Sequence, residues 1–116
     1  MIQLPASAQV FVLHESLSFR NGIDGHSAAV ARVMSKDPMD GAFYVFRSRS
    51  GQMLRLLFYD GGGFWLATKR LSKGCFRWWP TGDGDYSPLL VRELQILIWG
   101  GDPASGRFPA LWKKIA

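Results

Sequence analysis

Two histidines and an aspartate are the nearest approach to a metal site in this sequence. His14 falls in an extended, β-branched segment, whereas Asp24 and His26 stand two positions apart where a helix is expected. Residues two apart on a helix do not face each other, so the three side chains do not converge on one ion. We expect exposed or core-edge histidines here, with no metal and no cofactor.

The other groups that could perform catalysis are scattered. Cys75 is the only cysteine, which excludes an intrachain disulfide and a thiol cluster, and without a nearby histidine in sequence it is expected to act as a small apolar side chain. Metal-dependent phosphoryl transfer would need converging carboxylates. Most of the nine acidic residues fall in expected turns or helix caps, where they have structural roles. We therefore expect no catalytic residues and no enzyme activity.

The glycine triplet at residues 61–63 invites comparison with a phosphate-binding loop. Such a loop needs a strand before it and a helix after it, so that the helix N-terminus points free N–H groups at the anion. The residues that follow are FWLATK, which are aromatic and apolar with no helical period. The triplet is therefore interpreted as a turn between two strands, with Asp60 as its capping side chain.

Length and composition indicate one folded domain spanning residues 1–116. Of the 116 residues, 47% are hydrophobic and 14% aromatic, which is enough for a single core. Fourteen Lys and Arg against nine Asp and Glu give a net charge of +5, and this excess suits an anionic partner such as nucleic acid. The sequence has no signal-like start and no apolar run of bilayer length, so we expect a cytoplasmic protein without membrane contact.

The first part of the chain predicts a strand and then a helix. The strand is AQVFVLH, residues 8–14, which is rich in β-branched and aromatic side chains. Apolar positions at helical spacing predict a helix near residues 19–36, or one that begins only near Asp24. Gly22 and Gly25 would weaken this helix, so we expect a close backbone contact to use their missing side chains.

A second helix is predicted near residues 88–99, with Ser87 as its cap and Pro88 at its first position. The tail, residues 103–116, places apolar anchors such as Trp112 among basic residues. The fold class is therefore α+β, a single domain with two main helices packed against a sheet.

The centre of the chain, residues 42–80, predicts an antiparallel meander, which gives the sheet four to five strands. Three glycine-bearing breaks separate four aromatic and aliphatic runs. If the loop around Gly51 has three residues, with this glycine left-handed, then Phe46 faces Leu54, and the glycine triplet forms the next loop. One face of the sheet is then apolar, with Tyr44, Phe46, Leu54, Leu56, Phe58, Phe64, Leu66, Phe76 and Trp78.

The other face of the predicted sheet is basic and aromatic. From Arg47 to Arg77, seven basic residues stand against one acid, Asp60. Sheets that bind single-stranded nucleic acid place aromatic rings for base stacking among Arg and Lys for phosphate. The alternative is that a helix covers part of this face and buries Trp65 and Trp79, while the arginines are solvated. The residues on this face are Arg47, Arg55, Tyr59, Trp65, Lys69, Arg77 and Trp79.

Three segments in order resemble the transposon accessory protein of the insertion sequence sixty-six family, its second open reading frame product or TnpB type. They are FRNGIDGHSAAV, the run from DPMDG to RWWP, and LQILIWGGDP, and together they span roughly residues 18–103. His26 departs from the family pattern, where leucine is expected, and Arg55 stands where lysine is common. The matching basic positions include Arg20, Arg47, Arg49, Lys69 and Arg70.

The resemblance implies a protein that assists transposition while a separately encoded transposase performs strand transfer. The leading hypothesis is non-catalytic binding of nucleic acid, most simply the DNA of the mobile element. The rival is a protein-interaction adaptor that holds the transposase through the C-terminal helix and tail, including Trp99 and Trp112. Expected phosphate contacts are Arg47, Arg49, Arg55, Lys69, Arg70, Lys73 and Arg77, with Trp65 or Trp79 as stacking surfaces.

Overall fold

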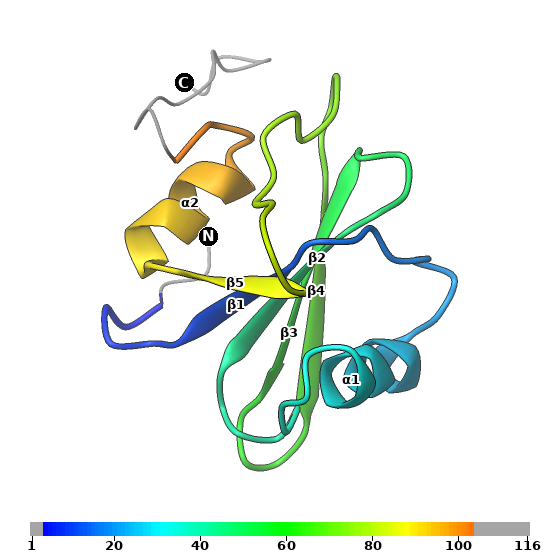
Figure 1. Ribbon diagram of the computed structural model, residues 1–116, viewed down its shortest axis with the longest axis vertical. Coiled ribbons are helices and arrows are strands. Elements are labelled where there is room, and N and C mark those ends of the chain that lie inside the picture. Colours follow the sequence, from blue (N-terminus) through cyan, green and yellow to red (C-terminus); the bar gives the residue numbers. More distant parts are fainter. Residues whose placement is uncertain (1–3, 104–116) are drawn as a thin grey trace.

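The computed structural model describes residues 4–103, which form one sheet with a helix on each side (Figure 1). The predicted α+β class with two helices is confirmed, whereas Trp112 and most of the tail lie outside the described residues. The order of the strands in the sheet is β4-β3-β2-β1-β5. The elements are β1 (Val10–Leu13), α1 (Ile23–Arg32), β2 (Phe43–Arg47), β3 (Met53–Tyr59), β4 (Phe64–Arg70), β5 (Tyr86–Leu89) and α2 (Val91–Ile98).

The sheet is mixed, which corrects the prediction of an antiparallel meander. Strands β2, β3 and β4 do form consecutive antiparallel hairpins, but β1 pairs in parallel with β2. The predicted fourth strand around Phe76 and Trp78 is not a strand. This segment crosses the end of the sheet instead, and the chain then returns as β5 beside β1, antiparallel to it. Phe76 contributes to the core without belonging to the sheet, because its ring is buried under α2.

The first hairpin loop has four residues, 49–52, rather than the three predicted. The N–H of Ser48 donates to the carbonyl of Met53 at 3.0 Å, so these two residues close the loop. The hydroxyl of Ser48 stabilises the longer loop by accepting a hydrogen bond from the N–H of Met53 at 3.1 Å. Gly51 has a φ of +75°, which confirms its predicted left-handed conformation.

The second hairpin loop has two residues, Gly61 and Gly62, one fewer than the predicted glycine triplet, because Asp60 and Gly63 close it. The N–H of Asp60 donates to the carbonyl of Gly63 at 3.1 Å. The carboxylate of Asp60 accepts the N–H groups of Gly62 and Gly63 at 2.8 and 2.9 Å. The interpretation of the glycine triplet as a turn, with Asp60 as its capping side chain, is therefore confirmed.

Each difference in loop length shifts the predicted register by one residue, and after the first loop Phe46 therefore faces Arg55 rather than Leu54. A shift of one residue moves a side chain to the other face of the sheet. The α2 side carries Val45, Arg47, Leu54, Leu56, Trp65 and Lys69, and the α1 side carries Tyr44, Phe46, Arg55, Leu57, Tyr59 and Leu66. The prediction of one apolar face and one basic face is therefore wrong, because a helix covers each side of the sheet and each side has its own apolar cluster.

Helix α1 begins at Ile23, so the later of the two predicted starts is confirmed. The expected close contact is found at Gly25, where a Cβ atom would lie 2.4 Å from the Cβ of Asn21. No atom lies within 4 Å of the corresponding position at Gly22. The small residue is therefore required at Gly25, while Gly22 is not crowded.

Helix α2 begins at Val91, three residues later than predicted, because Ser87 and Pro88 belong to β5. The hydroxyl of Ser87 lies 2.6 Å from Nε2 of His14 and so is not the helix cap. Neither α1 nor α2 has the length and apolar content that crossing a bilayer requires.

Candidate nucleic-acid interface

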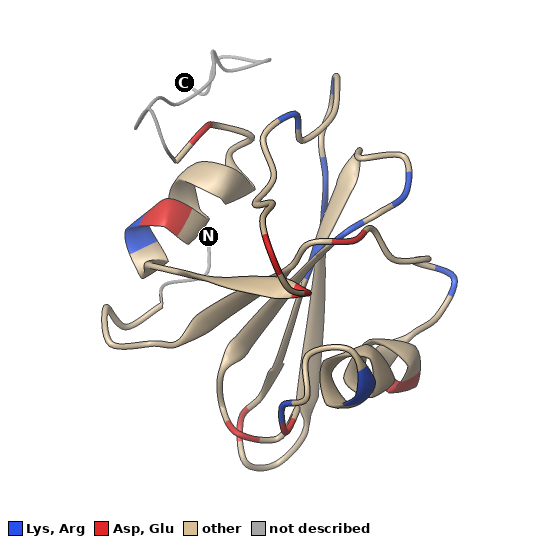
Figure 2. Ribbon diagram, viewed as in Figure 1, with Lys and Arg blue, Asp and Glu red and all other residues tan. Residues whose placement is uncertain are grey.

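Five of the seven predicted phosphate contacts gather at one end of the sheet. Arg47 ends β2, Arg49 lies in the β2–β3 loop, and Arg70 ends β4. The segment after β4 adds Lys73 and Arg77. Figure 2 shows this concentration of blue around the β2–β3 loop, the end of β4 and the segment that follows. We call these five residues the basic end.

Backbone hydrogen bonds fasten the two loops of the basic end to each other. The N–H of Leu71 donates to the carbonyl of Gln52 at 3.0 Å, and the N–H of Phe76 donates to that of Gly51 at 2.7 Å. A Cβ atom at Gly51 would lie only 3.3 Å from the Cβ of Cys75, so the two loops are in close contact. The basic side chains therefore project from a scaffold that is already ordered.

Arg47 is the most enclosed member of the basic end, whereas the other four are exposed. Its guanidinium carbon lies 4.9 Å from the centroid of the Trp79 ring. Burial lowers the pKa of Arg47, and the neighbouring Cys75 and Glu15 act in the opposite direction. We infer a mainly packing role for this arginine.

The two predicted stacking tryptophans are not exposed at the basic end. Trp79 is buried, and its indole N–H donates to the carbonyl of Leu13 at 2.9 Å. Trp65 is 57% exposed, but it lies at the start of β4, whereas Arg70 lies at the end of that strand. Its indole N–H donates to the carboxylate of Asp60 at 2.8 Å. Of the two tryptophans, only Trp79 fits the alternative of burial.

Arg55 uses its guanidinium to hold the chain segment before α1. Its Nη1 donates to the carbonyls of Phe19 and Asn21 at 3.0 and 3.1 Å, and its Nε donates to the hydroxyl of Thr68 at 2.9 Å. The guanidinium carbon also lies 4.4 Å from the centroid of the Phe19 ring. Arg55 is therefore a link between the sheet and the start of α1.

Lys69 has a comparable role at the other helix. Its ammonium donates to the carbonyl of Ile98 at 2.7 Å and lies 4.8 Å from the centroid of the Trp99 ring. A cation at a helix C-terminus complements the partial negative charge of the unpaired carbonyls. Burial lowers the pKa of Lys69. Sequence reasoning missed both internal roles, because the carbonyls that these side chains bind lie 29 to 36 residues away.

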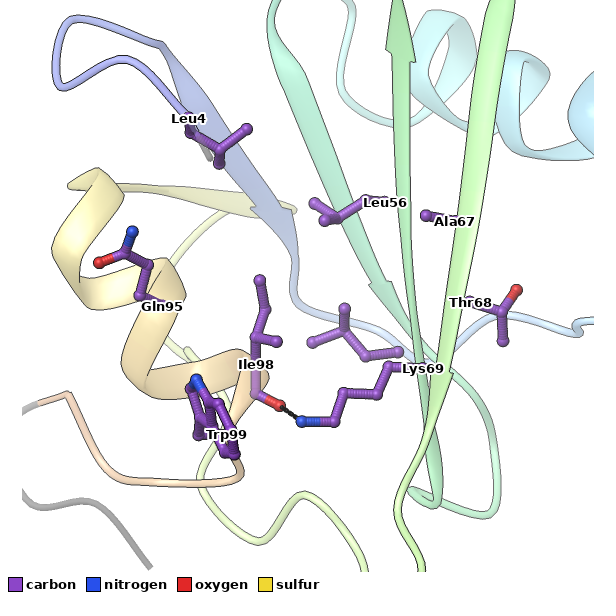
Figure 3. Close-up of a pocket in the computed structure, with 9 residues that line it drawn as sticks. Leu4, Leu56, Ala67, Thr68, Lys69, Gln95, Ile98 and Trp99 are labelled. Carbon is purple, nitrogen blue, oxygen red and sulfur yellow. Dashed lines mark hydrogen bonds between the residues drawn. The ribbon is translucent and has the colours of Figure 1, made fainter. Parts of the chain in front are cut away.

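A pocket of about 370 Å³ lies between α2 and strands β3 and β4 (Figure 3). Leu54, Leu56 and Ala67 form its sheet side, and Ile98 and Trp99 close it at the end of α2. The Lys69 side chain runs along one edge toward the carbonyl of Ile98. This pocket can accept an apolar side chain.

The histidines do not form a metal site with each other. His14 is hydrogen-bonded to Gly84 and Ser87, whereas His26, which belongs to α1, is fully buried. Nδ1 of His26 donates to the carbonyl of Gly22 at 2.8 Å, and its Nε2 has no hydrogen-bond partner. Among residues 4–103 no three His, Cys, Asp or Glu side chains are placed to hold a metal ion.

Comparisons with known proteins give a consistent result. The family model for IS66 Orf2 like protein matches residues 8–107. The uncharacterized protein y4hO of Sinorhizobium fredii (strain NBRC 101917 / NGR234) is 32% identical over 102 residues, which cover 88% of each chain. The uncharacterized protein y4jC of the same strain is 34% identical over 102 residues, covering 88% of this chain and 86% of the relative. No solved structure matches with statistical significance.

Proposed function

Because this chain belongs to the family of IS66 Orf2-like proteins, accessory proteins of IS66 transposition, we propose that it assists transposition by binding DNA without catalysis. The DNA would be that of the mobile element, and the basic end would be the binding surface. The observation that carries this proposal is the gathering of Arg49, Arg70, Lys73 and Arg77, all exposed, on two loops fastened by backbone hydrogen bonds.

The chemistry of the basic end favours phosphate as its ligand. Exposed Arg and Lys side chains bind phosphate oxygens and release condensed counterions, which supplies affinity without reading the base sequence. An ordered scaffold reduces the entropy lost when the complex forms. We therefore propose contacts to the nucleic-acid backbone, with no part for base stacking by Trp79.

Acidic residues also lie at the end of the sheet away from the basic end. Asp37 and Asp40 lie in the connection between α1 and β2, and Asp60 begins the β3–β4 loop. Figure 2 shows the red segments of these connections at the end of the sheet away from the basic end. Glu15 and Asp85 flank β1 and β5 at the same end as Arg47, so the basic end is a local cluster on the two fastened loops and not one pole of the whole molecule.

The experiment is equilibrium binding of the purified protein to labelled single-stranded and duplex DNA across a salt series. We expect binding that weakens steeply with salt. The double variant Arg49→Ala, Arg77→Ala should bind more weakly, with a salt slope shallower by about one for each lost phosphate contact.

The matched control is the double variant Arg32→Ala, Arg92→Ala, which removes the same charge from exposed positions on α1 and α2. It should bind nearly as well as the wild type. If both double variants lose affinity equally, net charge alone explains binding and the basic end is not the site. If the wild type does not bind at low salt, the DNA-binding proposal fails.

The second candidate function is an adaptor that holds the transposase, and the apolar pocket beside α2 favours it. A partner could insert an apolar side chain between Leu56 and Trp99. Calorimetric titration with purified transposase tests this idea. The variant Gln95→Trp, which would fill the pocket from α2, should abolish heat of binding while leaving DNA affinity unchanged; an unchanged heat of binding would exclude the pocket.

A further inference from the structure

Strand β4 is one of the two edge strands of the sheet, with seven residues and no strand beyond it among the described residues. An edge strand presents a row of backbone N–H and C=O groups to any chain that can pair with it. Trp65, Thr68 and Arg70 on this strand are exposed. Among residues 4–103, the outer edge of this strand therefore has no strand paired with it.

The hydrogen bonds that flank β4 show which of its backbone groups point outward. At one end the carbonyl of Gly63 accepts the N–H of Asp60, and at the other the N–H of Leu71 donates to Gln52. Residues 63 and 71 therefore point their backbone groups toward the neighbouring strand. Because these groups alternate along an antiparallel strand, the outward groups belong to Phe64, Leu66, Thr68 and Arg70.

We propose that β4 pairs antiparallel with β4 of a second copy of this chain, around a two-fold axis at Ala67. In this register Leu66 faces the partner's Thr68, and Phe64 faces the partner's Arg70. The two-fold axis repeats both pairs, which makes four pairs in all. All of these residues have outward backbone groups, so the four pairs would exchange about eight hydrogen bonds. Ala67 would face the partner's Ala67, and this small side chain allows close approach at the axis.

The side chains of β4 are complementary to themselves in this antiparallel arrangement. The strand begins with Phe64 and Trp65 and ends with Lys69 and Arg70. Antiparallel pairing places Phe64 opposite the partner's exposed Arg70, so that an aromatic ring meets a cationic side chain. It also places Trp65 opposite the partner's Lys69, whose aliphatic stem the indole can cover while the ammonium stays on the carbonyl of Ile98. A parallel arrangement would instead place cation beside cation.

Trp65 is already fixed in a position to make such a contact. Its ring is stacked on that of Phe58, with centroids 6.0 Å apart and planes 6° from parallel. Its indole N–H is held by Asp60. A large exposed side chain that is already ordered loses little entropy when it is covered. The carboxylate of Asp60 also lies at the end of β4 that would adjoin the partner's basic end.

Sedimentation equilibrium of the full chain is the first test, and a dimer is the expected result. Cysteine cross-linking then tests the register in a Cys75→Ser background, since Cys75 is the only native cysteine. Ala67→Cys should form a disulfide between the two chains, because directly opposed residues at a two-fold axis reach disulfide distance. Oxidised glutathione is the oxidant, and it is reduced to two glutathione molecules. Thr68→Cys, whose thiol would face the partner's Leu66, should cross-link much less.

Charge reversal at Trp65 provides a second test. Trp65→Lys would place a lysine opposite the partner's Lys69 at two places in the dimer, whereas Trp65→Glu would place a carboxylate there. The dimer dissociation constant of Trp65→Lys should therefore be at least tenfold higher than that of Trp65→Glu. In the monomer position 65 lies beside Asp60, so Trp65→Lys should give the more stable monomer and Trp65→Glu the less stable one. Because this order is opposite to that of dimer affinity, a general loss of folding cannot produce the same result. Any of three results would overturn the proposal. These are a monomer at every concentration, stronger cross-linking of Thr68→Cys than of Ala67→Cys, and equal dissociation constants for the two charge variants.

Discussion

The guanidinium of Arg47 lies over the ring of Trp79, and the indole N–H of Trp79 donates to the carbonyl of Leu13. These contacts connect the end of β2, the segment before β5 and the end of β1. A residue that appears in the sequence as a stacking surface for bases is therefore part of the core.

Trp79→Phe is expected to lower the free energy of unfolding by about 1–3 kcal/mol, because it keeps an aromatic ring but removes the donor of a buried hydrogen bond. Urea denaturation measures this change. DNA affinity, measured on the folded variant, should stay within twofold of the wild type. A large loss of affinity at unchanged stability would show that this indole contacts the ligand after all.

Arg55→Ala and Arg70→Ala should separate structural from ligand-binding arginines. Arg55→Ala removes donors to Phe19, Asn21 and Thr68 and should cost about 1–3 kcal/mol of stability. Arg70 is exposed, so Arg70→Ala should change the free energy of unfolding by less than about 0.5 kcal/mol. Denaturation curves for the two variants provide the comparison, and equal destabilisation would contradict the assignment.

His26 should make the protein less stable as the pH falls. Burial is the main cause that holds the pKa of His26 below its ordinary value of 6.5; the charge of Arg55 adds to this effect, and the hydrogen bond to Gly22 opposes it. The unfolded chain therefore binds a proton more readily, so this contribution to stability is complete above pH 6.5 and is lost as the pH falls through the folded-state pKa.

His26→Leu introduces the residue that the family resemblance leads one to expect at this position, and it removes the unpaired Nε2 atom. The free energy of unfolding of the variant should depend less on pH between 7 and about 5 than that of the wild type. Thermal unfolding at several pH values measures the difference. Parallel pH profiles for the two proteins would exclude His26 as the cause.

Gly25→Ala should be destabilising, although alanine is intrinsically the better helix former. The new methyl group would overlap Asn21, and relief of this contact is expected to cost about 1–3 kcal/mol. Gly22→Ala is the control, because no atom lies within 4 Å of its Cβ position. In denaturant unfolding, Gly25→Ala should have a clearly lower free energy of unfolding than Gly22→Ala. The reverse order would show that Asn21 moves aside at little cost.

The sequence allowed good prediction of local features and poorer prediction of long-range ones. The start of α1, the left-handed Gly51 and the turn capped by Asp60 follow from nearby residues, and the structure confirms them. The family resemblance is confirmed in the same way, since it rests on motifs in order along the chain. These features were accessible because their causes lie within a few residues.

The faces of the sheet were harder to predict, because one extra loop residue reverses every side chain of a strand. The hydroxyl of Ser48 stabilises a four-residue loop, and no pattern in the sequence distinguishes it from a three-residue loop. The candidate site was therefore predicted as a strip across one face, whereas five of its basic residues lie at an end. The parallel pairing of β1 with β2 joins segments 30 or more residues apart, which local patterns do not report.

Strand β1 lies between β2 and β5, so the first strand of residues 4–103 is in the interior of the sheet and the last strand of that range completes it. During synthesis on the ribosome, the hairpins of β2, β3 and β4 are made before β5 exists to cover the open edge of β1. Long-range pairings of this kind are slow to form, since the chain must first close a large loop. While residues 86–98 are still being synthesised, β1 therefore lacks its β5 neighbour, and that edge of β1 has no partner strand in the described part of the chain.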